Sequence, residues 1–278
     1  FLQVWTDISD IKRKENDLQQ LLDTIDQIPT IILLWDKDHK LIHSNEMAKS
    51  NAKSRLKIEL KDGITRKESD QFAVRSHSMA NEAWEKGWIS EEVFPVGSLS
   101  MDEGIRPETN QEILSSLRTV FSEDGQVTAG NASQVSDGAS AVLIASEEAA
   151  KREGWPILAR IVDYATSGVE SNRVMSAPIP TVRKLLKTTG MSLEDIDILE
   201  HNEAFASASC AIRDSLEIPD GSFNPHGGAI AIGHPLGATG ARCLMTLVNA
   251  MRRRGSRRGI VTVCLGGGNA VAMMVECP

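Results

Sequence analysis

Three short segments of the sequence combine glycine with side chains that can move protons. The segment 201–206 begins His-Asn-Glu, the segment 224–242 is rich in glycine and contains His226 and His234, and Cys264 precedes three consecutive glycines. Glycine lets the backbone approach a ligand closely and adopt positive φ angles. A thiol of lowered pKa can take a proton from carbon or attack a carbonyl group, and an imidazole can relay that proton. These residue types favour acyl or carbon–carbon chemistry on a carbonyl compound.

The same glycines do not match the common nucleotide-binding patterns. Gly233–Gly240 leads into a predicted helix, so its backbone N–H groups point towards whatever lies there. The spacing is neither that of the dinucleotide fingerprint nor that of the phosphate-binding loop. The other histidines show no metal-ligand spacing; they are His39, His43, His77, His201 and His226. We therefore expect neither a metal nor a resident cofactor.

Composition sets the class of protein. The chain has 278 residues and a net charge of −8, with 41% hydrophobic and 24% charged residues. This acidic balance argues against a nucleic-acid partner and against a basic membrane-binding surface. No stretch approaches the roughly 20 apolar residues that span a bilayer. The four cysteines form no CxxC pair, which favours reduced thiols and a cytoplasmic location.

Helical and strand patterns alternate over most of the chain, which predicts an α/β layered domain. Thr65-Arg-Lys-Glu68 is a capping box and opens the first of these helices. The predicted strands are 127–129, 141–145, 198–200, 260–264 and 271–276, and the predicted helices are 65–86, 108–121, 147–153, 180–189, 203–216 and 238–253.

The first 63 residues have a different character, rich in Lys, Asp, Gln and Ile. Apolar residues recur at helical spacing over Ser9–Gln27, and Thr30–Trp35 and Lys40–His43 form a predicted hairpin. This order resembles the joint between two PAS sensor domains, with only the first part of the second domain present. A plain helical linker followed by a hairpin explains the pattern equally well.

From Ile64 to Pro278 the chain resembles the C-terminal part of a thiolase, an acetyl-CoA C-acyltransferase. The resemblance rests on ordered motifs over more than two hundred residues: Ile64-Thr-Arg-Lys-Glu-Ser-Asp-Gln-Phe-Ala-Val74, Asp102-Glu-Gly-Ile-Arg-Pro-Glu108, Thr128-Ala-Gly-Asn-Ala-Ser133, Asp137-Gly-Ala, Asn202-Glu-Ala-Phe205, Gly227-Gly-Ala-Ile-Ala-Ile-Gly-His-Pro-Leu-Gly-Ala-Thr-Gly240 and Cys264-x-Gly-Gly-Gly268. It implies a thiolase-like αβα domain, incomplete here, and acyl-CoA thiolysis or condensation in fatty acid metabolism.

The resemblance also assigns catalytic roles. His234 would activate the nucleophile that accepts the acyl group. Cys264 would take or return the α-proton of the acyl-CoA. Asn202 would hold a water that forms, with His234, an oxyanion hole for the enolate oxygen. The N–H of Gly266 would contribute to a second oxyanion hole.

The same comparison implies that coenzyme A thioesters are the substrate. The residues expected to contact coenzyme A or the acyl group are Ser133 and Ala129 (pantetheine), Phe121 (adenine), Ala204 and Phe205 (acyl end) and Arg106 (phosphates). An acidic protein needs local positive charge to hold so anionic a ligand. Intact thiolases are commonly homo-oligomers, a state left open for this chain.

The family's acylated cysteine, in a motif resembling Asn-x-x-Cys-x-Ser-Gly, is absent, since the first cysteine is Cys210. We therefore expect a chain that is inactive as it stands, with exposed apolar surface. Two departures bear on the site: Ala270 replaces a usual glycine, and Met175-Ser-Ala-Pro178 differs from the usual loop. The expected domains are 1–63, 64–150 and 151–278. A PAS-linked CoA-binding signalling protein and an artefactual fusion near Gly63 remain alternatives.

Overall fold

The computed structural model describes residues 63–278 and the backbone of two short strands near the N-terminus. These strands, β1 (Leu33–Trp35) and β2 (Leu41–Ser44), pair in antiparallel fashion. The predicted hairpin therefore forms. The helix predicted over Ser9–Gln27 lies outside the described residues.

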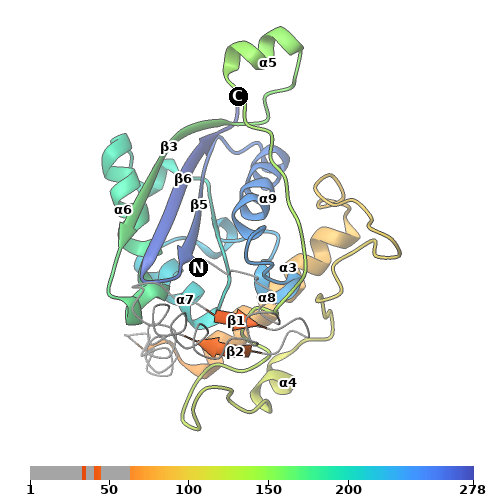
Figure 1. Ribbon diagram of the computed structural model, residues 1–278, viewed down its shortest axis with the longest axis vertical. Helices are drawn as coiled ribbons and strands as arrows, with labels where there is room; N and C mark the ends of the chain where they lie inside the picture. The colour runs from red at the N-terminus through yellow and green to blue at the C-terminus, as the bar shows by residue number, and fades with distance from the viewer. Residues whose placement is uncertain (1–32, 36–40, 45–62) are drawn as a thin grey trace, which may run out of the picture.

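A four-stranded mixed sheet forms the centre of the molecule (Figure 1). Its order is β3 (Arg160–Gly168), β6 (Asn269–Glu276), β5 (Arg258–Leu265) and β4 (Ile198–His201). The strand β4 runs parallel to β5, whereas β6 is antiparallel to both β5 and β3. The chain after β4 and the chain after β5 therefore begin at the same edge of the sheet, and the candidate residues Asn202 and Cys264 lie there.

Helices cover both faces of this sheet, which confirms the α/β layered class. The described α-helices are α3 (Arg66–Glu85), α4 (Gln111–Ser115), α5 (Glu147–Glu153), α6 (Pro178–Thr189), α7 (Ala206–Ser215), α8 (Ala229–Ile232) and α9 (Thr239–Arg254). Figure 1 shows α6 and α9 on opposite sides of the sheet. None of the helices in the described part of the chain combines the length and apolar character needed to cross a membrane.

Each face has its own apolar core. On the α9 side, buried residues of α9 pack against buried residues of β4 and β5. They include Leu247, Met251 and Ile198. The other side joins α6 and α7 to the sheet through residues such as Leu185 and Ile260. Because both faces are covered, β4 is buried along its whole length, and β5 is buried from Gly259 to Thr262.

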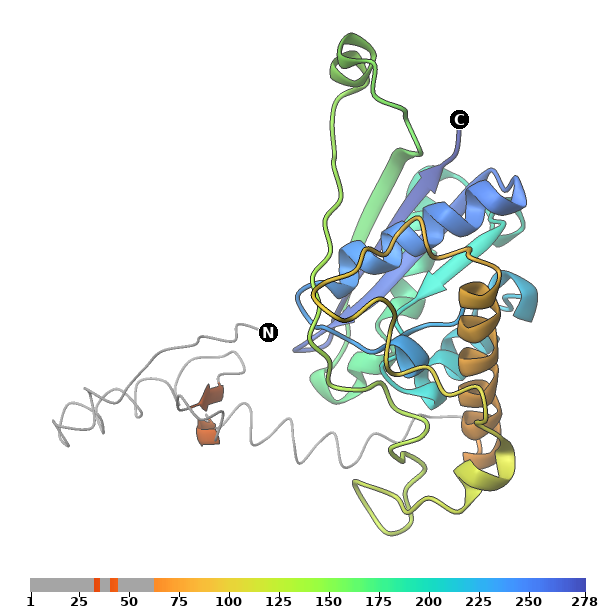
Figure 2. The same cartoon turned by 90° about the vertical axis from the view of Figure 1, so that its right-hand side faces the viewer.

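Helix α3 brings a distant part of the sequence to this assembly. Its predicted capping box is present, with the Glu68 N–H donating to Thr65 Oγ1 and the Thr65 N–H donating to Glu68. The helix packs against α7 and α8, and the ring of Phe72 meets that of Phe223 edge-on at 6.0 Å. Figure 2 shows α3 beside the end of the sheet from which the candidate residues project.

Three predicted elements are wrong in whole or part. The helix expected over 108–121 is reduced to α4, and 127–129 contributes only an isolated bridge at Thr128. The strand expected at Ala141–Ala145 is absent: residues 133–146 form an extended segment that runs to α5 (Figure 2). An apolar run becomes a strand only if a neighbour completes its ladder, and none of the described strands is hydrogen-bonded to this segment.

Candidate active site

Asn202 and His234 meet at the edge of the sheet. Asn202 follows β4 directly, and its backbone N–H donates to the carbonyl of Thr262 on β5 at 3.2 Å. His234 lies in the turn between α8 and α9. The Nδ2 atom of Asn202 is 3.3 Å from Nε2 of His234. The structure therefore brings together two of the catalytic residues expected from the sequence.

The hydroxyl of Thr239 determines which nitrogen of His234 carries a proton. This hydroxyl donates its one hydrogen to the carbonyl of Pro235 at 2.9 Å, and its oxygen lies 2.6 Å from Nδ1 of His234. The oxygen can therefore only accept from the ring, so we assign the proton to Nδ1. The Nε2 lone pair is left facing the Asn202 amide. Thr239 was not identified from the sequence, although it starts α9 five residues after the histidine.

The surroundings of His234 keep the imidazole neutral. Partial burial lowers the pKa of His234, and the positive charge of Arg242 lowers it further. A neutral imidazole with a bare Nε2 is able to accept a proton. The side chain is half-buried, so this nitrogen is held in one orientation.

Replacing Thr239 with valine should release the imidazole from this tautomer. Valine has nearly the same shape but cannot accept the Nδ1 hydrogen, which leaves that group unsatisfied. We expect a loss of about 1–3 kcal/mol in the free energy of unfolding. Nitrogen NMR of the ring should change from the Nδ1–H form to a mixture. An unchanged ring spectrum would contradict the assignment.

Cys264 lies near the end of β5, in the same layer as the expected acyl-binding residues. Its sulfur is 3.9 Å from the sulfur of Met175, which belongs to the loop where the sequence departs from the family. Both pack in one apolar cluster with Ala204 and Phe205. The other departure, Ala270, is buried in β6 with an ordinary φ and pairs with Cys264 in the ladder. The sheet thus accommodates alanine at this position.

Burial distinguishes Cys264 from two other thiols. Cys210 and Cys243 are both fully buried, and this raises the pKa of each to about 12. They therefore pack as apolar side chains at neutral pH, as expected from their helical positions. Cys264 is only partly buried.

The turn after Cys264 depends on glycine. Gly267 and Gly268 both have positive φ, at 82° and 94°. A side chain at Gly268 would place its Cβ 2.2 Å from the carbonyl oxygen of Val169, and the Val169 N–H donates to the Gly268 carbonyl at 2.7 Å. The turn that carries Gly266 is therefore pressed against the end of β3.

The expected coenzyme A residues fall into two groups. Ser133 joins the acyl-end residues, because its N–H donates to the carbonyl of Ala204 at 3.0 Å. Phe121 meets Phe205 edge-on, with ring centroids 6.1 Å apart. Ala129 lies in the turn preceding Ser133. Arg106 is exposed, and its backbone N–H donates to His77 at 3.2 Å; no hydrogen bond or ion pair among the described residues links it to the others.

A buried carboxyl group and a guanidinium group contact each other near the site. Glu200 on β4 is fully buried, and its Oε1 atom is 3.1 Å from Nη1 of Arg242 on α9. Burial raises the pKa of the Glu200 carboxyl to about 8, while the charge of Arg242 limits the rise. This pair was not identified from the sequence, because the contact joins residues 42 positions apart that only the folded chain brings together.

This raised pKa should make the fold less stable as the pH rises. Between the ordinary carboxyl value of 4.5 and about 8, folded Glu200 holds a proton that the unfolded chain has lost. Stability is therefore lost as pH rises towards 8. From pH 6.5 to 8.5 we expect the free energy of unfolding to fall by about 1–2 kcal/mol. Denaturant unfolding of Glu200→Gln should show a smaller fall.

The window starts at pH 6.5 because buried histidines act in the opposite sense below it. Burial lowers the pKa of His201 and His226 to about 4. These two groups therefore reduce the free energy of unfolding only as the pH falls below 6.5. Glu276→Gln is the matched control. Arg257 lowers the pKa of Glu276, which stays ionised throughout the window. An equal fall in all three proteins would contradict the prediction.

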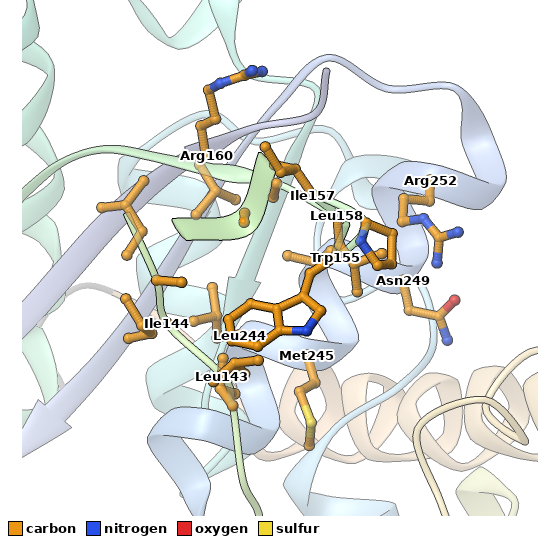
Figure 3. Close-up of a pocket in the computed structure, with 18 of the residues that line it drawn as sticks. Leu143, Ile144, Trp155, Ile157, Leu158, Arg160, Leu244, Met245, Asn249 and Arg252 are labelled. Carbon is orange, nitrogen blue, oxygen red and sulfur yellow. The ribbon is translucent and has the colours of Figure 1, made fainter. Parts of the chain in front are cut away.

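An apolar concavity lies away from these groups. It has a volume of about 740 Å³ and is lined by the extended segment, by the chain leading into β3 and by α9. Figure 3 shows Trp155 between Leu143 of the extended segment and Met245 of α9. Leu143 and Ile144 are 74% and 67% exposed, in line with the exposed apolar surface expected from the sequence. None of the expected site residues lines this concavity.

No group of three or more His, Cys, Asp and Glu side chains within the described part of the chain is arranged to hold a metal ion. The candidate residues at the sheet edge carry an amide, an imidazole and a thiol, groups that can bind and move protons at oxygen, sulfur and carbon.

Comparison with known proteins gives the family. A family model for the thiolase C-terminal domain matches residues 155–277, and one for the thiolase N-terminal domain matches residues 40–148. Acetyl-CoA acetyltransferase of Paracoccus denitrificans is 44% identical over 77% of this chain, and human mitochondrial 3-ketoacyl-CoA thiolase is 40% identical over 79%. In both cases the match covers 57% of the relative.

Solved structures agree. The crystal structure of human mitochondrial 3-ketoacyl-CoA thiolase in complex with CoA has a TM-score of 0.77 and 38% identity, covering 88% of this chain and 61% of that one. Acetyl-CoA acetyltransferase of Bacillus anthracis has a TM-score of 0.77 and 31% identity, covering 90% and 72%. The sheet, its helices and the paired family models define a thiolase-type α/β fold. The chain belongs to the thiolase family, and it spans little more than half the length of the curated relatives.

Proposed function

We propose that this chain carries out the α-carbon half of thiolase chemistry on a coenzyme A thioester. The observation that supports this most directly is the contact between Asn202 and His234 at the sheet edge from which Cys264 also arises. The relatives are acyltransferases that act on acetyl-CoA or 3-ketoacyl-CoA, as their names state.

In the proposed step, Cys264 in its thiolate form takes a proton from the carbon next to the thioester carbonyl. The electrons of the broken C–H bond become the enolate, and the negative charge moves to the carbonyl oxygen. His234 first accepts at Nε2 the proton that leaves the Cys264 thiol, which generates this thiolate, and the resulting N–H then donates to the enolate oxygen. Preorganised donors of this kind supply much of the rate gain in enzymes.

The amide of Asn202 supports the second half of this oxyanion hole. Its Oδ1 atom is buried and has no hydrogen-bond partner within the described residues. Buried polar atoms are normally paired, so an unpaired one beside reactive groups favours a bound water or ligand. We propose that Asn202 holds a water facing the enolate oxygen, and that the N–H of Gly266 serves the tetrahedral intermediate.

Coenzyme A binding is part of the proposal. One structural relative is known in complex with CoA. The contact of Ser133 with Ala204, and that of Phe121 with Phe205, join the expected pantetheine and adenine residues to the acyl end of the site. Arg106, exposed and cationic, is proposed for the phosphates. Titration with CoA should show binding below millimolar concentration, and none at that level would reject this part.

Deuterium exchange into acetyl-CoA tests the α-carbon step. The purified chain and acetyl-CoA are mixed in D₂O, and loss of the methyl signal is followed by proton NMR. We expect exchange well above the rate without protein. No increase over that background would reject the proposed function.

Complete turnover is a separate matter. None of the four cysteines has the neighbours of the acylated family cysteine, so the covalent step has no nucleophile in this sequence. We therefore expect no thiolysis of acetoacetyl-CoA by CoA at the rate of an ordinary thiolase. Loss of the enolate absorbance of acetoacetyl-CoA measures this rate. Such turnover would contradict the proposed incompleteness.

Other parts of the sequence interpretation remain proposals. These are the division at residues 63 and 150, the PAS-like character of residues 1–63 and the cytoplasmic location. The relatives include mitochondrial enzymes, so location needs its own experiment. The homo-oligomeric state is likewise to be measured, by light scattering.

A further inference from the structure

We propose that Asn224 is a positioning residue: its side chain binds the backbone of His201 and the carboxylate of Glu203, the two neighbours of Asn202, and so holds the Asn202 amide against His234. This inference rests on the proposed function for its kinetic consequence. Asn224 lies 22 positions from Asn202 in the sequence, within the glycine-rich segment, and belongs to none of the groups expected to touch substrate.

The side chain of Asn224 uses all its groups on the two neighbours of Asn202. Its Oδ1 accepts from the N–H of His201 at 2.7 Å, and its Nδ2 donates to the carbonyl of the same residue at 2.8 Å. Nδ2 also donates to Oε1 of Glu203 at 2.8 Å. All four residues are buried, so these bonds do not compete with solvent.

Glu203 extends this clamp to the segment that carries His234. Its Oε2 accepts from the hydroxyl of Ser76 on α3 at 2.6 Å and from the N–H of Ile230 on α8 at 3.3 Å. Helix α8 leads directly into the turn of His234. One hydrogen-bonded network therefore fixes the Asn202 backbone and the start of the helix before the histidine. The 3.3 Å contact between Asn202 and His234 therefore depends on the position of both segments that this network joins.

The backbone of Asn224 shows that this position is held under strain. Its φ is +42°, and Glu217 is the one other non-glycine residue with positive φ in the described part of the chain. Asparagine adopts the left-handed conformation more readily than most non-glycine residues, but still less readily than glycine. Glycine would avoid that cost, yet it has no amide to form the clamp. Strain of this kind persists where the surrounding structure requires it, often at functional sites.

Asn224→Gly separates these two effects, because glycine keeps the backbone angle and removes only the clamp. Glu217→Gly is the matched control: it relieves the same kind of strain at an exposed residue away from the site. Acetyl-CoA exchange in D₂O should be about 100-fold slower in Asn224→Gly, as for a misplaced catalytic group. The Kd for CoA should not change, and Glu217→Gly should match the native chain in both.

Amide hydrogen exchange by mass spectrometry gives a readout that needs no catalysis. Peptides covering residues 199–205 should exchange faster in Asn224→Gly, while those of β5 and β6 should keep native protection. If the native chain shows no proton exchange in acetyl-CoA, the proposed function fails. In that case the amide hydrogen exchange of residues 199–205 alone decides whether Asn224 is a positioning residue. Native protection of 199–205 in the variant would overturn it.

Asn224→Asp covers the case in which the glycine variant does not fold. Aspartate has nearly the same size and keeps the oxygen that accepts from His201, but it cannot donate to Glu203. We expect slower acetyl-CoA exchange with an unchanged Kd for CoA. An acetyl-CoA exchange rate equal to that of the native chain in a folded aspartate variant would overturn the inference. A parallel loss of CoA binding and of acetyl-CoA exchange would also overturn it, because it indicates a general structural defect.

Discussion

Changing Cys264 to alanine is expected to slow the exchange of acetyl-CoA protons by about 1,000-fold, the usual contribution of a positioned general base. The thiol is the one group of the three-residue site that can take a proton from carbon while His234 faces the oxygen side. Alanine fits the apolar cluster with Met175 and Phe205, so folding should not suffer. Proton NMR in D₂O measures the rate.

Cys277→Ala is the matched control. Cys277 is also partly buried, at the far end of the sheet from the site, and its N–H donates to the Arg257 carbonyl, a backbone contact that alanine keeps. We expect native exchange in this control and a native Kd for CoA in both variants. Exchange that survives in Cys264→Ala would assign proton removal to another group and exclude the role proposed for this thiol.

The second large effect concerns the turn after Cys264. Gly268→Ala puts a methyl group 2.2 Å from the carbonyl oxygen of Val169 and also forces alanine to a φ of +94°. We expect a loss of about 2–5 kcal/mol in the free energy of unfolding, from the left-handed backbone together with overpacking. Because the turn begins two residues after the thiol, acetyl-CoA exchange should fall as well.

The neighbouring glycine supplies the control for this turn. Gly267 has a φ of +82°, but a Cβ there would meet only the side chain of Asn269, at 3.7 Å. Gly267→Ala therefore carries the backbone cost without the overlap, and should lose only about 1–2 kcal/mol. Equal losses in the two variants, by denaturant unfolding, would show that contact with β3 does not constrain the turn.

Sequence patterns located the candidate residues, and the resemblance to thiolases supplied the roles proposed for them. His234, Asn202 and Cys264 stand in glycine-rich or strand-end contexts, and periodic patterns placed them beside α7, α9, β4 and β5. The structure confirms these elements within a few residues and brings Asn202 into contact with His234. Local patterns are reliable here because cap residues, glycine and apolar periodicity act over one or two turns.

The supporting residues could not be found in this way. Thr239 at the start of α9 and Asn224 in a bend are ordinary polar residues, and their roles arise from partners that only the folded chain brings near. The error at 141–145 has the same origin, because a strand depends on its neighbour. Strand β3 was missed for the opposite reason: most of its residues are exposed, so no apolar pattern marks it, and it forms by pairing with β6.

The order of pairing in the sheet has a consequence for how the protein is made. On the ribosome, β3 emerges long before β6, which is its one ladder partner among the described strands, and β4 emerges before its partner β5. Ser76 of α3 reaches Glu203 across 127 residues of sequence. Contacts of such long separation form late and slowly. The catalytic edge therefore cannot assemble until nearly all of the chain has been synthesised, and during translation the nascent sheet depends on protection from aggregation.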